Sequence, residues 1–153
     1  AQHLDNETFD SAWDKCFPWV GGKKITTQVG TQPQGWNAAN IYGAGGKGQS
    51  DQLVTENIGR ENTGKAVKIQ NVYAAYGTFG SWAPGYLTLG TPWSTSVGTG
   101  KKDGGTFGGI DFTYKPDAIS FYYKWNKEVE GKASFIGYLY CVRCLLPTSA
   151  TVT

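Results

Sequence analysis

Glycine interrupts this chain so often that a fold of long helices is excluded. It supplies 22 of the 153 residues, about twice the usual ~7%, and it separates short runs of aromatic and β-branched residues. Glycine destabilises helix interiors, whereas the Ser, Thr and Asn residues around it favour turns and strands. The pattern predicts an all-β fold of short antiparallel strands, a sandwich or a barrel. At this length we expect a single domain over residues 1–153.

Five segments arrange their apolar residues as strands do. The clearest is residues 118–125, where Ile119, Phe121, Tyr123 and Trp125 alternate with other residues and share one face. The remaining predicted strands are residues 65–70, 85–89, 110–114 and 134–140. Two regions, residues 30–60 and 90–109, lack the pattern and are rich in turn-forming residues, so we predict loops there.

The charged residues argue against two classes of partner. Lysine and arginine number 14 against 12 acidic residues, and most of the 14 are lysine. Arginine is the usual residue for bidentate recognition of phosphates and bases, so its scarcity argues against a nucleic-acid partner. No apolar run approaches the ~18 residues of a spanning helix, so we expect no membrane span in this chain. The chain begins at Ala1 rather than Met, and we expect a trimmed terminus from which any signal peptide would already be gone.

Three cysteines and one histidine offer little for metal or nucleophilic chemistry. Cys141 and Cys144 form a lone C-x-x-C, Cys16 lies far away in the sequence, and His3 lies near the terminus. A zinc site needs a second pair of ligands, and a Ser-His-Asp or Cys-His site needs a well-placed base. We therefore expect no cofactor and buried or incidental thiols.

Two further patterns are weak. Residues 43–48 match G-x-G-x-x-G, but neither the preceding strand nor the following helix of a dinucleotide site is predicted, so we interpret them as a loop. A structural calcium ion stays open because Asp103, Asp111 and Asp117 are available, although no EF-hand loop is present.

Tryptophan is the most informative residue type. Five of the six tryptophans have Gly, Pro, Asp, Ser or Asn neighbours rather than an apolar strand run, and they are Trp13, Trp19, Trp36, Trp82 and Trp93. A ring in a loop can offer its apolar face to the C–H face of a sugar. We therefore predict carbohydrate binding through Trp36, Trp82 and Trp93. The alternative is that these rings cap the end of a sandwich core.

A hydrolytic reaction is a further alternative. Glycoside hydrolysis uses two carboxyl groups at a defined separation. The carboxyl groups that could supply such a pair are Asp10, Asp14, Asp51, Asp111, Asp117, Glu128 and Glu130. We favour the interpretation of these carboxyl groups as solvated turn residues over a catalytic pair.

The order of the segments resembles one known family. Residues 9–13 have the sequence FDSAW, and residues 33–36 have the sequence PQGW, with Asn40 shortly after. Further along the chain come the predicted strand at residues 65–69 and the segments 85–90 and 108–112. The most specific piece is PDAISFYYKW at residues 116–125. This order resembles the carbohydrate metabolism domain abbreviated PCMD, found in surface proteins of gut bacteria. The resemblance covers about residues 9–140, whereas residues 141–148 depart from it, so the C-terminal end is atypical or truncated.

The resemblance implies a jelly-roll β-sandwich similar to carbohydrate-binding modules. It also implies an exported protein of the periplasm or outer-membrane surface, often a lipoprotein and sometimes with other domains. Of the matched positions, Trp36, Asn40, Tyr122 and Lys124 are the expected sugar contacts. The sequence therefore predicts a non-catalytic carbohydrate-recognition domain of a bacterial surface protein, whose partner is a polysaccharide or oligosaccharide. The alternatives are a glycoside hydrolase and a structural or adhesive surface module without a small ligand.

Overall fold

The computed structural model describes residues 3–20, 23–43, 50–76, 78–94, 104–126, 131–139 and 150–152. The chain divides into two compact units, an N-terminal unit of residues 3–110 and a C-terminal unit of residues 1–2 and 111–153. The described residues hold antiparallel strand pairs and a single 3-10 turn, η2 (Arg60–Asn62), so the predicted all-β class is confirmed. The sheets are small, since each contains two strands.

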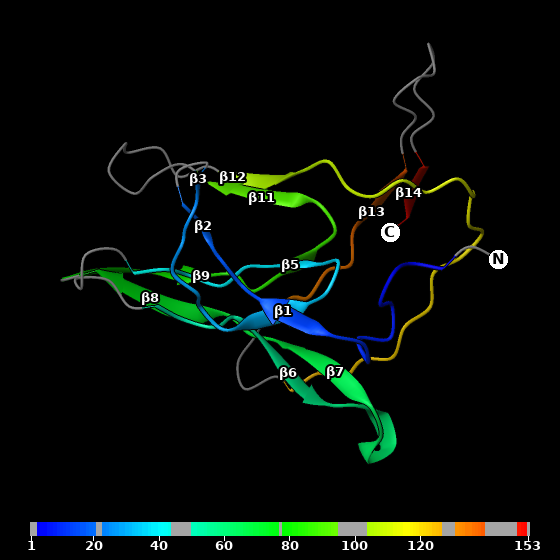
Figure 1. Ribbon diagram of the computed structural model, residues 1–153, viewed down its shortest axis with the longest axis horizontal. Coiled ribbons are helices and arrows are strands. Elements are labelled where there is room, and N and C mark those ends of the chain that lie inside the picture. Colours follow the sequence, from blue (N-terminus) through cyan, green and yellow to red (C-terminus); the bar gives the residue numbers. More distant parts are fainter. Residues whose placement is uncertain are drawn as a thin grey trace, which may run out of the picture. The chain divides into compact units, whose positions relative to one another are not determined.

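Six of the strand pairs belong to the N-terminal unit (Figure 1). They are β1 (Trp13–Lys15) with β4 (Thr31–Pro33), β2 (Trp19–Val20) with β3 (Lys23–Lys24), β5 (Asn37–Ala38) with β10 (Leu87–Thr88), β6 (Val54–Ile58) with β7 (Lys65–Ile69), β8 (Val72–Tyr76) with β9 (Phe79–Ala83), and β11 (Thr91–Ser94) with β12 (Gly104–Phe107). The C-terminal unit contains β13 (Gly137–Leu139) paired with β14 (Ala150–Val152).

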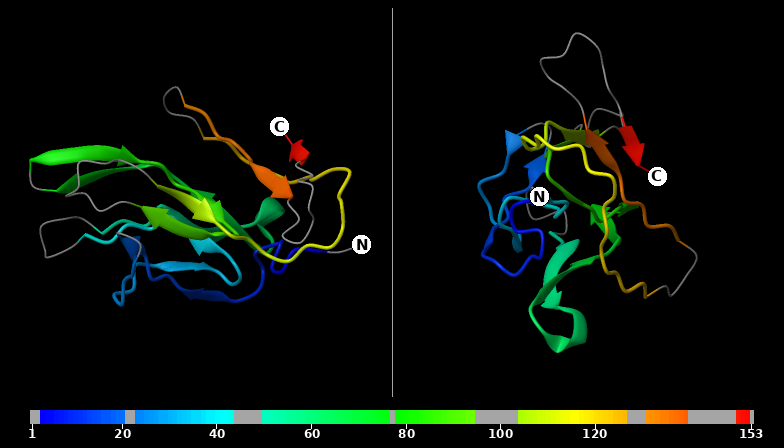
Figure 2. Two further views of the ribbon diagram at one scale, coloured as in Figure 1. Left: turned by 90° about the horizontal axis from the view of Figure 1, so that it is seen from above. Right: turned by 90° about the vertical axis from the view of Figure 1, so that its right-hand side faces the viewer.

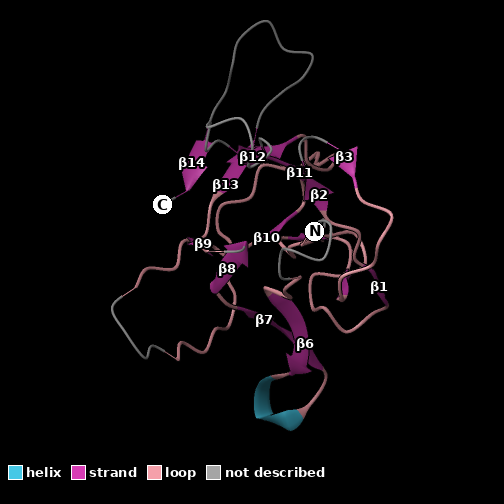
Figure 3. Cartoon of the chain, turned by 90° about the vertical axis from the view of Figure 1, so that its left-hand side faces the viewer, coloured by secondary structure: helices cyan, strands magenta, loops and turns pink. Residues whose placement is uncertain are grey.

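The prediction of strands is best at β7. The predicted strand at residues 65–70 is β7, which pairs in register with β6 from Val54↔Ile69 to Ile58↔Lys65. The helical turn η2 lies at the far end of this hairpin (Figure 3). The predicted strand at 85–89 is reduced to β10, which pairs with the two residues of β5.

The two predicted loop regions contain strands, so that prediction is wrong in both places. Residues 30–60 include β4, β5 and β6, and residues 90–109 include the β11–β12 hairpin. The strands were missed because Thr, Gln, Asn and Gly dominate them, and backbone pairing does not require an apolar alternation. Glycine at position 105 has a specific use, since a Cβ there would lie 3.2 Å from the indole Nε1 of Trp93 on the opposite strand.

The core of the N-terminal unit is small and gathers around a β-bulge. Cys16 faces two residues of the opposite chain: its N–H donates to the Gly30 carbonyl at 3.1 Å, and its carbonyl accepts from the Val29 N–H at 2.9 Å. Two residues opposite one define a bulge. Gly30 has a positive φ of 69°, a backbone conformation that glycine adopts without steric cost. Cys16, Ala38 and Val54 form a buried cluster with Val67 and Leu87 packed against it, and Val29 and Leu53 are buried as well.

The clearest predicted strand, residues 118–125, is not a strand in the structure. The segment runs beside residues 131–139 in the C-terminal unit (orange in Figure 2), and side-chain contacts join the two. The Phe121 and Phe135 rings stack with centroids 5.2 Å apart. Phe121 and Trp125 are 56% and 50% exposed, so they do not form the core that the alternation predicted. Alternation specifies which side chains share a face, but it does not bring a partner backbone within hydrogen-bonding distance.

Two other predicted strands also change in this part of the chain. Residues 110–114 form no strand. Of the strand predicted at residues 134–140, residue 140 lies outside the described part, and among residues 134–139 only the three residues of β13 form a strand.

Candidate functional site

The β8–β9 hairpin, at the left of Figure 1, carries a pair of exposed aromatic rings. Tyr73 and Trp82 lie opposite each other in the register and are 51% and 69% exposed. Their ring centroids are 5.7 Å apart and the ring planes meet at 75°, the edge-to-face arrangement that aromatic pairs favour. Trp82 was predicted as a sugar contact, whereas Tyr73 was missed. Residues 77–78 begin with glycine and lie between aromatic residues, which is a sequence signal for a two-residue hairpin turn. A hairpin with that turn places Tyr73 opposite Trp82, so this signal could have identified Tyr73.

The face that holds this pair is otherwise made of small residues. In an antiparallel pair, alternate residues share a face, so Ala75 and Gly80 lie on the same side as Tyr73 and Trp82. A Cβ at position 80 would lie 2.5 Å from Cε1 of Tyr73, which shows that the tyrosine ring lies over the glycine. The aromatic pair therefore stands on a face that has almost no other side-chain bulk.

Trp36 lies in the turn between β4 and β5 and is partly buried. Its ring meets Phe9 edge to face with centroids 5.5 Å apart. Its indole Nε1 is buried and has no hydrogen-bond partner. These contacts indicate a packing role, as the alternative interpretation of the tryptophans proposed.

Trp93 lies in β11, opposite Gly105 of β12, and is partly buried. It packs over the backbone of that glycine, since the position of a Cβ at residue 105 is 3.2 Å from its Nε1. Trp82, Trp93, Trp13 and Trp19 all lie in strands, so the prediction that they lie in loops is wrong. Only Trp36 of the five lies outside a strand.

Asn40 has a structural role rather than an exposed one. It is 6% exposed, and its amide Nδ2 donates to the Val29 carbonyl at the bulge, at 2.9 Å. Its Oδ1 accepts from the backbone N–H groups of Leu53 at 2.9 Å and Val54 at 3.0 Å. The side chain therefore satisfies three buried backbone groups from two separate segments, and it offers no free amide to a ligand.

Tyr122 and Lys124 belong to the C-terminal unit and are exposed, Tyr122 at 82%. They alternate with Phe121 and Tyr123, whose rings are 6.1 Å apart. The structure therefore divides the six predicted contacts. Trp36, Asn40, Trp82 and Trp93 lie in separate elements of the N-terminal unit, and Tyr122 and Lys124 lie in the other unit.

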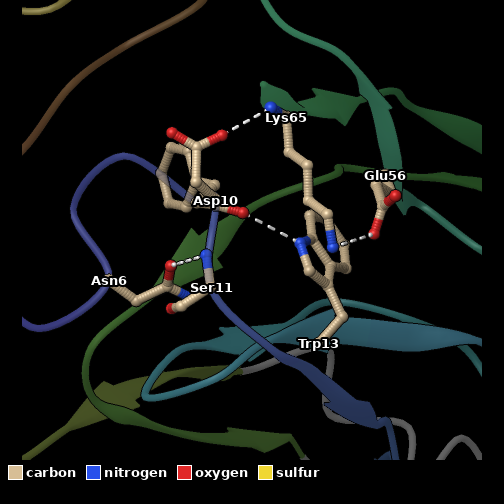
Figure 4. A network of polar contacts seen from close by, with 7 residues as sticks. Asn6, Asp10, Ser11, Trp13, Glu56 and Lys65 are labelled. Atoms are coloured by element: carbon tan, nitrogen blue, oxygen red, sulfur yellow. Dashed lines mark hydrogen bonds and ion pairs between the residues drawn. The ribbon is translucent and has the colours of Figure 1, made fainter. Parts of the chain in front are cut away.

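The candidate carboxyl groups that the structure describes contact the backbone or lie on separate elements. Asp10 Oδ1 accepts from the Lys65 N–H at 2.6 Å, and the Lys65 ammonium lies 3.3 Å from Glu56 Oε2 (Figure 4). Asp14 is an exposed residue of β1, and Asp51 forms a β-bridge with Ile41. Asp111 and Asp117 are in the C-terminal unit, and Glu128 and Glu130 lie outside the described residues. Asp10 is therefore a connector between the N-terminal segment and the β6–β7 hairpin.

The described residues show no group of three His, Cys, Asp or Glu side chains that could hold a metal ion. His3 pairs with Glu7 instead, Nδ1 to Oε1 at 2.7 Å. Burial raises the pKa of the Cys16 thiol to about 11, against smaller lowering effects of an Asn40 hydrogen bond and the Lys24 charge. This thiol is therefore poorly nucleophilic at neutral pH.

Other sequence patterns fall in parts of the chain that the structure does not describe. Asp103, Cys141, Cys144 and most of the glycine motif at 43–48 are among those residues. Over the residues that are described, no helix is both long and apolar enough to cross a membrane.

Comparison with known proteins adds no assignment. No family model, no curated protein and no solved structure matches this chain.

Proposed function

We propose that this chain is a non-catalytic carbohydrate-recognition domain and that its binding surface is the Tyr73–Trp82 pair on the β8–β9 hairpin. The exposure of Trp82 carries the proposal, because an indole that is 69% exposed on a strand contributes little to a core. Exposed aromatic rings bind the apolar C–H face of a sugar, and one such contact contributes about 0.5–1.5 kcal/mol by analogy with aromatic pairs. The resemblance to the PCMD family supports a sugar as ligand and a jelly-roll sandwich of an exported bacterial surface protein as the setting.

The matched variants Trp82→Ala and Phe107→Ala test this function. Phe107 is an aromatic residue of β12 with a similar exposure, 59%, and it belongs to a different hairpin. The purified chain is applied to immobilised plant, host and microbial polysaccharides, and hits are followed by intrinsic tryptophan fluorescence. We expect retention that Trp82→Ala removes and Phe107→Ala leaves unchanged, with no release of reducing ends. Absence of retention on every glycan would refute the proposal.

A structural or adhesive module is the second candidate, because the C-terminal unit exposes many large apolar side chains. Those more than two-fifths exposed are Tyr114, Ile119, Phe121, Tyr122, Tyr123, Trp125, Phe135, Ile136 and Tyr138. Exposed apolar patches mark interaction surfaces. This function predicts association that increases with concentration in sedimentation velocity, that Phe121→Ser weakens, and that no glycan changes.

A further inference from the structure

The geometry of the Tyr73–Trp82 pair limits the shape of a ligand. Because the two ring planes meet at 75°, the rings cannot both lie flat against one plane. A flat polymer surface can stack on both rings only where their faces lie in one common plane. Two rings at nearly a right angle form a corner instead, which can contact one sugar residue on two of its sides.

The hairpin also limits the charge of a ligand. The strands β8 and β9 contain no Asp, Glu, Lys or Arg. An anionic sugar is recognised through charge-assisted hydrogen bonds from Arg or Lys. The corner offers the Tyr73 hydroxyl and the Trp82 indole N–H, which suit neutral hydroxyl groups.

Small neighbours keep other side chains away from the rings. Gly80 has no side chain and Ala75 has only a methyl group, so neither adds bulk beside the aromatic pair. The Tyr73 ring lies over Gly80, and a methyl group at that position would push it away. The arrangement of the two rings therefore depends on the absence of a side chain at position 80.

We infer that the Tyr73–Trp82 corner binds a single neutral sugar residue, at a chain end or a branch of a soluble glycan. The inference rests on the proposed function and specifies its ligand class. Two ring contacts of this size give a weak Kd, in the range of several to about a hundred millimolar. Because one residue is bound, the affinity does not grow with the length of the oligosaccharide.

Titration of the full chain with neutral oligosaccharides tests the inference. The probes are the disaccharide and hexasaccharide of the β-1,4-glucan, β-1,4-xylan, β-1,4-mannan and α-1,4-glucan series, with hexagalacturonate as the anionic probe and microcrystalline cellulose and α-chitin as flat ones. For the series that binds, we expect Kd values within about threefold between disaccharide and hexasaccharide, and no binding to the anionic or the flat probes.

Variants connect the binding to the corner. We expect Trp82→Ala and Tyr73→Ala each to weaken glycan binding about two- to tenfold. Tyr73→Phe keeps the ring and is expected to weaken binding less than Tyr73→Ala, and Phe107→Ala is the exposed control. Thermal unfolding of each variant checks that the fold is kept.

The outcomes separate this inference from the proposed function. A tenfold gain in affinity from disaccharide to hexasaccharide, retention on a flat polymer, or preference for hexagalacturonate would overturn the single-residue corner and leave carbohydrate recognition in place. Binding that survives Trp82→Ala would overturn the assignment to this hairpin. No binding to any glycan, soluble or immobilised, would refute both.

Discussion

Replacing Asn40 with alanine removes the side chain that satisfies the buried backbone of the N-terminal unit. The Val29 carbonyl at the bulge and the N–H groups of Leu53 and Val54 each lose their partner in this variant. Leu53 and Val54 are 1% and 0% exposed, so water does not reach them without opening the core. The effect is therefore larger than that of an ordinary surface substitution.

The magnitude follows from the number of groups left unsatisfied. A buried donor or acceptor without a partner costs about 1–3 kcal/mol. Three such groups, with partial relief from a water molecule in the vacated space, give an expected loss of about 3–6 kcal/mol in the free energy of unfolding. Since domains of this size are stable by about 5–15 kcal/mol, the variant lies near the limit of folding.

Urea unfolding followed by tryptophan fluorescence measures the effect. Asn57→Ala is the matched control, because Asn57 is exposed and its side chain accepts a hydrogen bond from the N–H of Ile58 at 2.9 Å. We expect the control to change stability by at most about 0.5 kcal/mol. A loss below about 1 kcal/mol for Asn40→Ala would refute the structural role of this side chain.

The nearly isosteric variant Asn40→Asp separates lost hydrogen bonds from lost volume. Its carboxyl group keeps an acceptor for Leu53 and Val54, but when ionised it faces the Val29 carbonyl with a second oxygen. Burial and this opposed carbonyl raise the pKa of the introduced carboxyl above its ordinary value of about 3.9. The folded state then binds its proton more tightly than the unfolded state does, so the stability of the variant relative to the unsubstituted chain is highest below pH ~4 and falls as pH rises through the folded pKa. A difference in stability between the two chains that is equal at pH ~4 and pH ~8 would contradict this hydrogen-bond assignment.

Three further predictions concern other parts of the N-terminal unit. Burial raises the pKa of Cys16 to about 11. In a chain whose other two cysteines are replaced by serine, iodoacetamide at pH 8 should therefore label Cys16 at least about tenfold more slowly in the native state than in guanidinium, and equal labelling rates would show that the thiol is accessible. The stability that this thiol contributes should fall as pH rises from about 9 toward 11. Gly80→Ala should displace the Tyr73 ring and lower glycan affinity with little change in thermal unfolding, so unaltered affinity would count against a role for the tyrosine. Asp10→Ala frees the Lys65 N–H and should cost about 0.5–1.5 kcal/mol in urea unfolding, whereas Asp10→Asn, which keeps an acceptor, should cost less; equal losses would argue against the hydrogen bond.

The sequence predicts the fold class better than it predicts the strands. Glycine content and short apolar runs predicted an all-β chain, and the antiparallel pairs confirm that class. β7 was found because Val67 and Ile69 alternate with polar residues. β4 (sequence TQP) and β5 (sequence NA) were missed, because such short polar segments form strands only where a partner strand lies beside them. A local sequence pattern does not reveal that partner.

The candidate site was predicted only in part, for a related reason. Trp82 has the same kind of local neighbours as Trp36, and nothing in the two sequences separates an exposed ring from one packed against Phe9. Asn40 looked like a polar residue available to a ligand, but the bulge at Val29 created a buried carbonyl that only a donor from another segment could satisfy. Such a requirement arises from tertiary structure, so a single sequence cannot show it.

The segment at 118–125 shows what an alternating pattern does determine. The Phe121 ring stacks on the Phe135 ring. A Cβ atom placed on Gly137 would lie 3.9 Å from Cδ1 of Ile119, so these two residues also face each other. Both pairs obey one antiparallel register, because the sum 121 + 135 equals the sum 119 + 137, namely 256. The side chains therefore keep the spacing of a strand pair even though residues 118–125 are not assigned to a strand. Alternation thus determines which face of the segment meets its neighbour, and the backbone hydrogen bonds of a sheet require in addition that the two chains approach to about 4.7–4.9 Å.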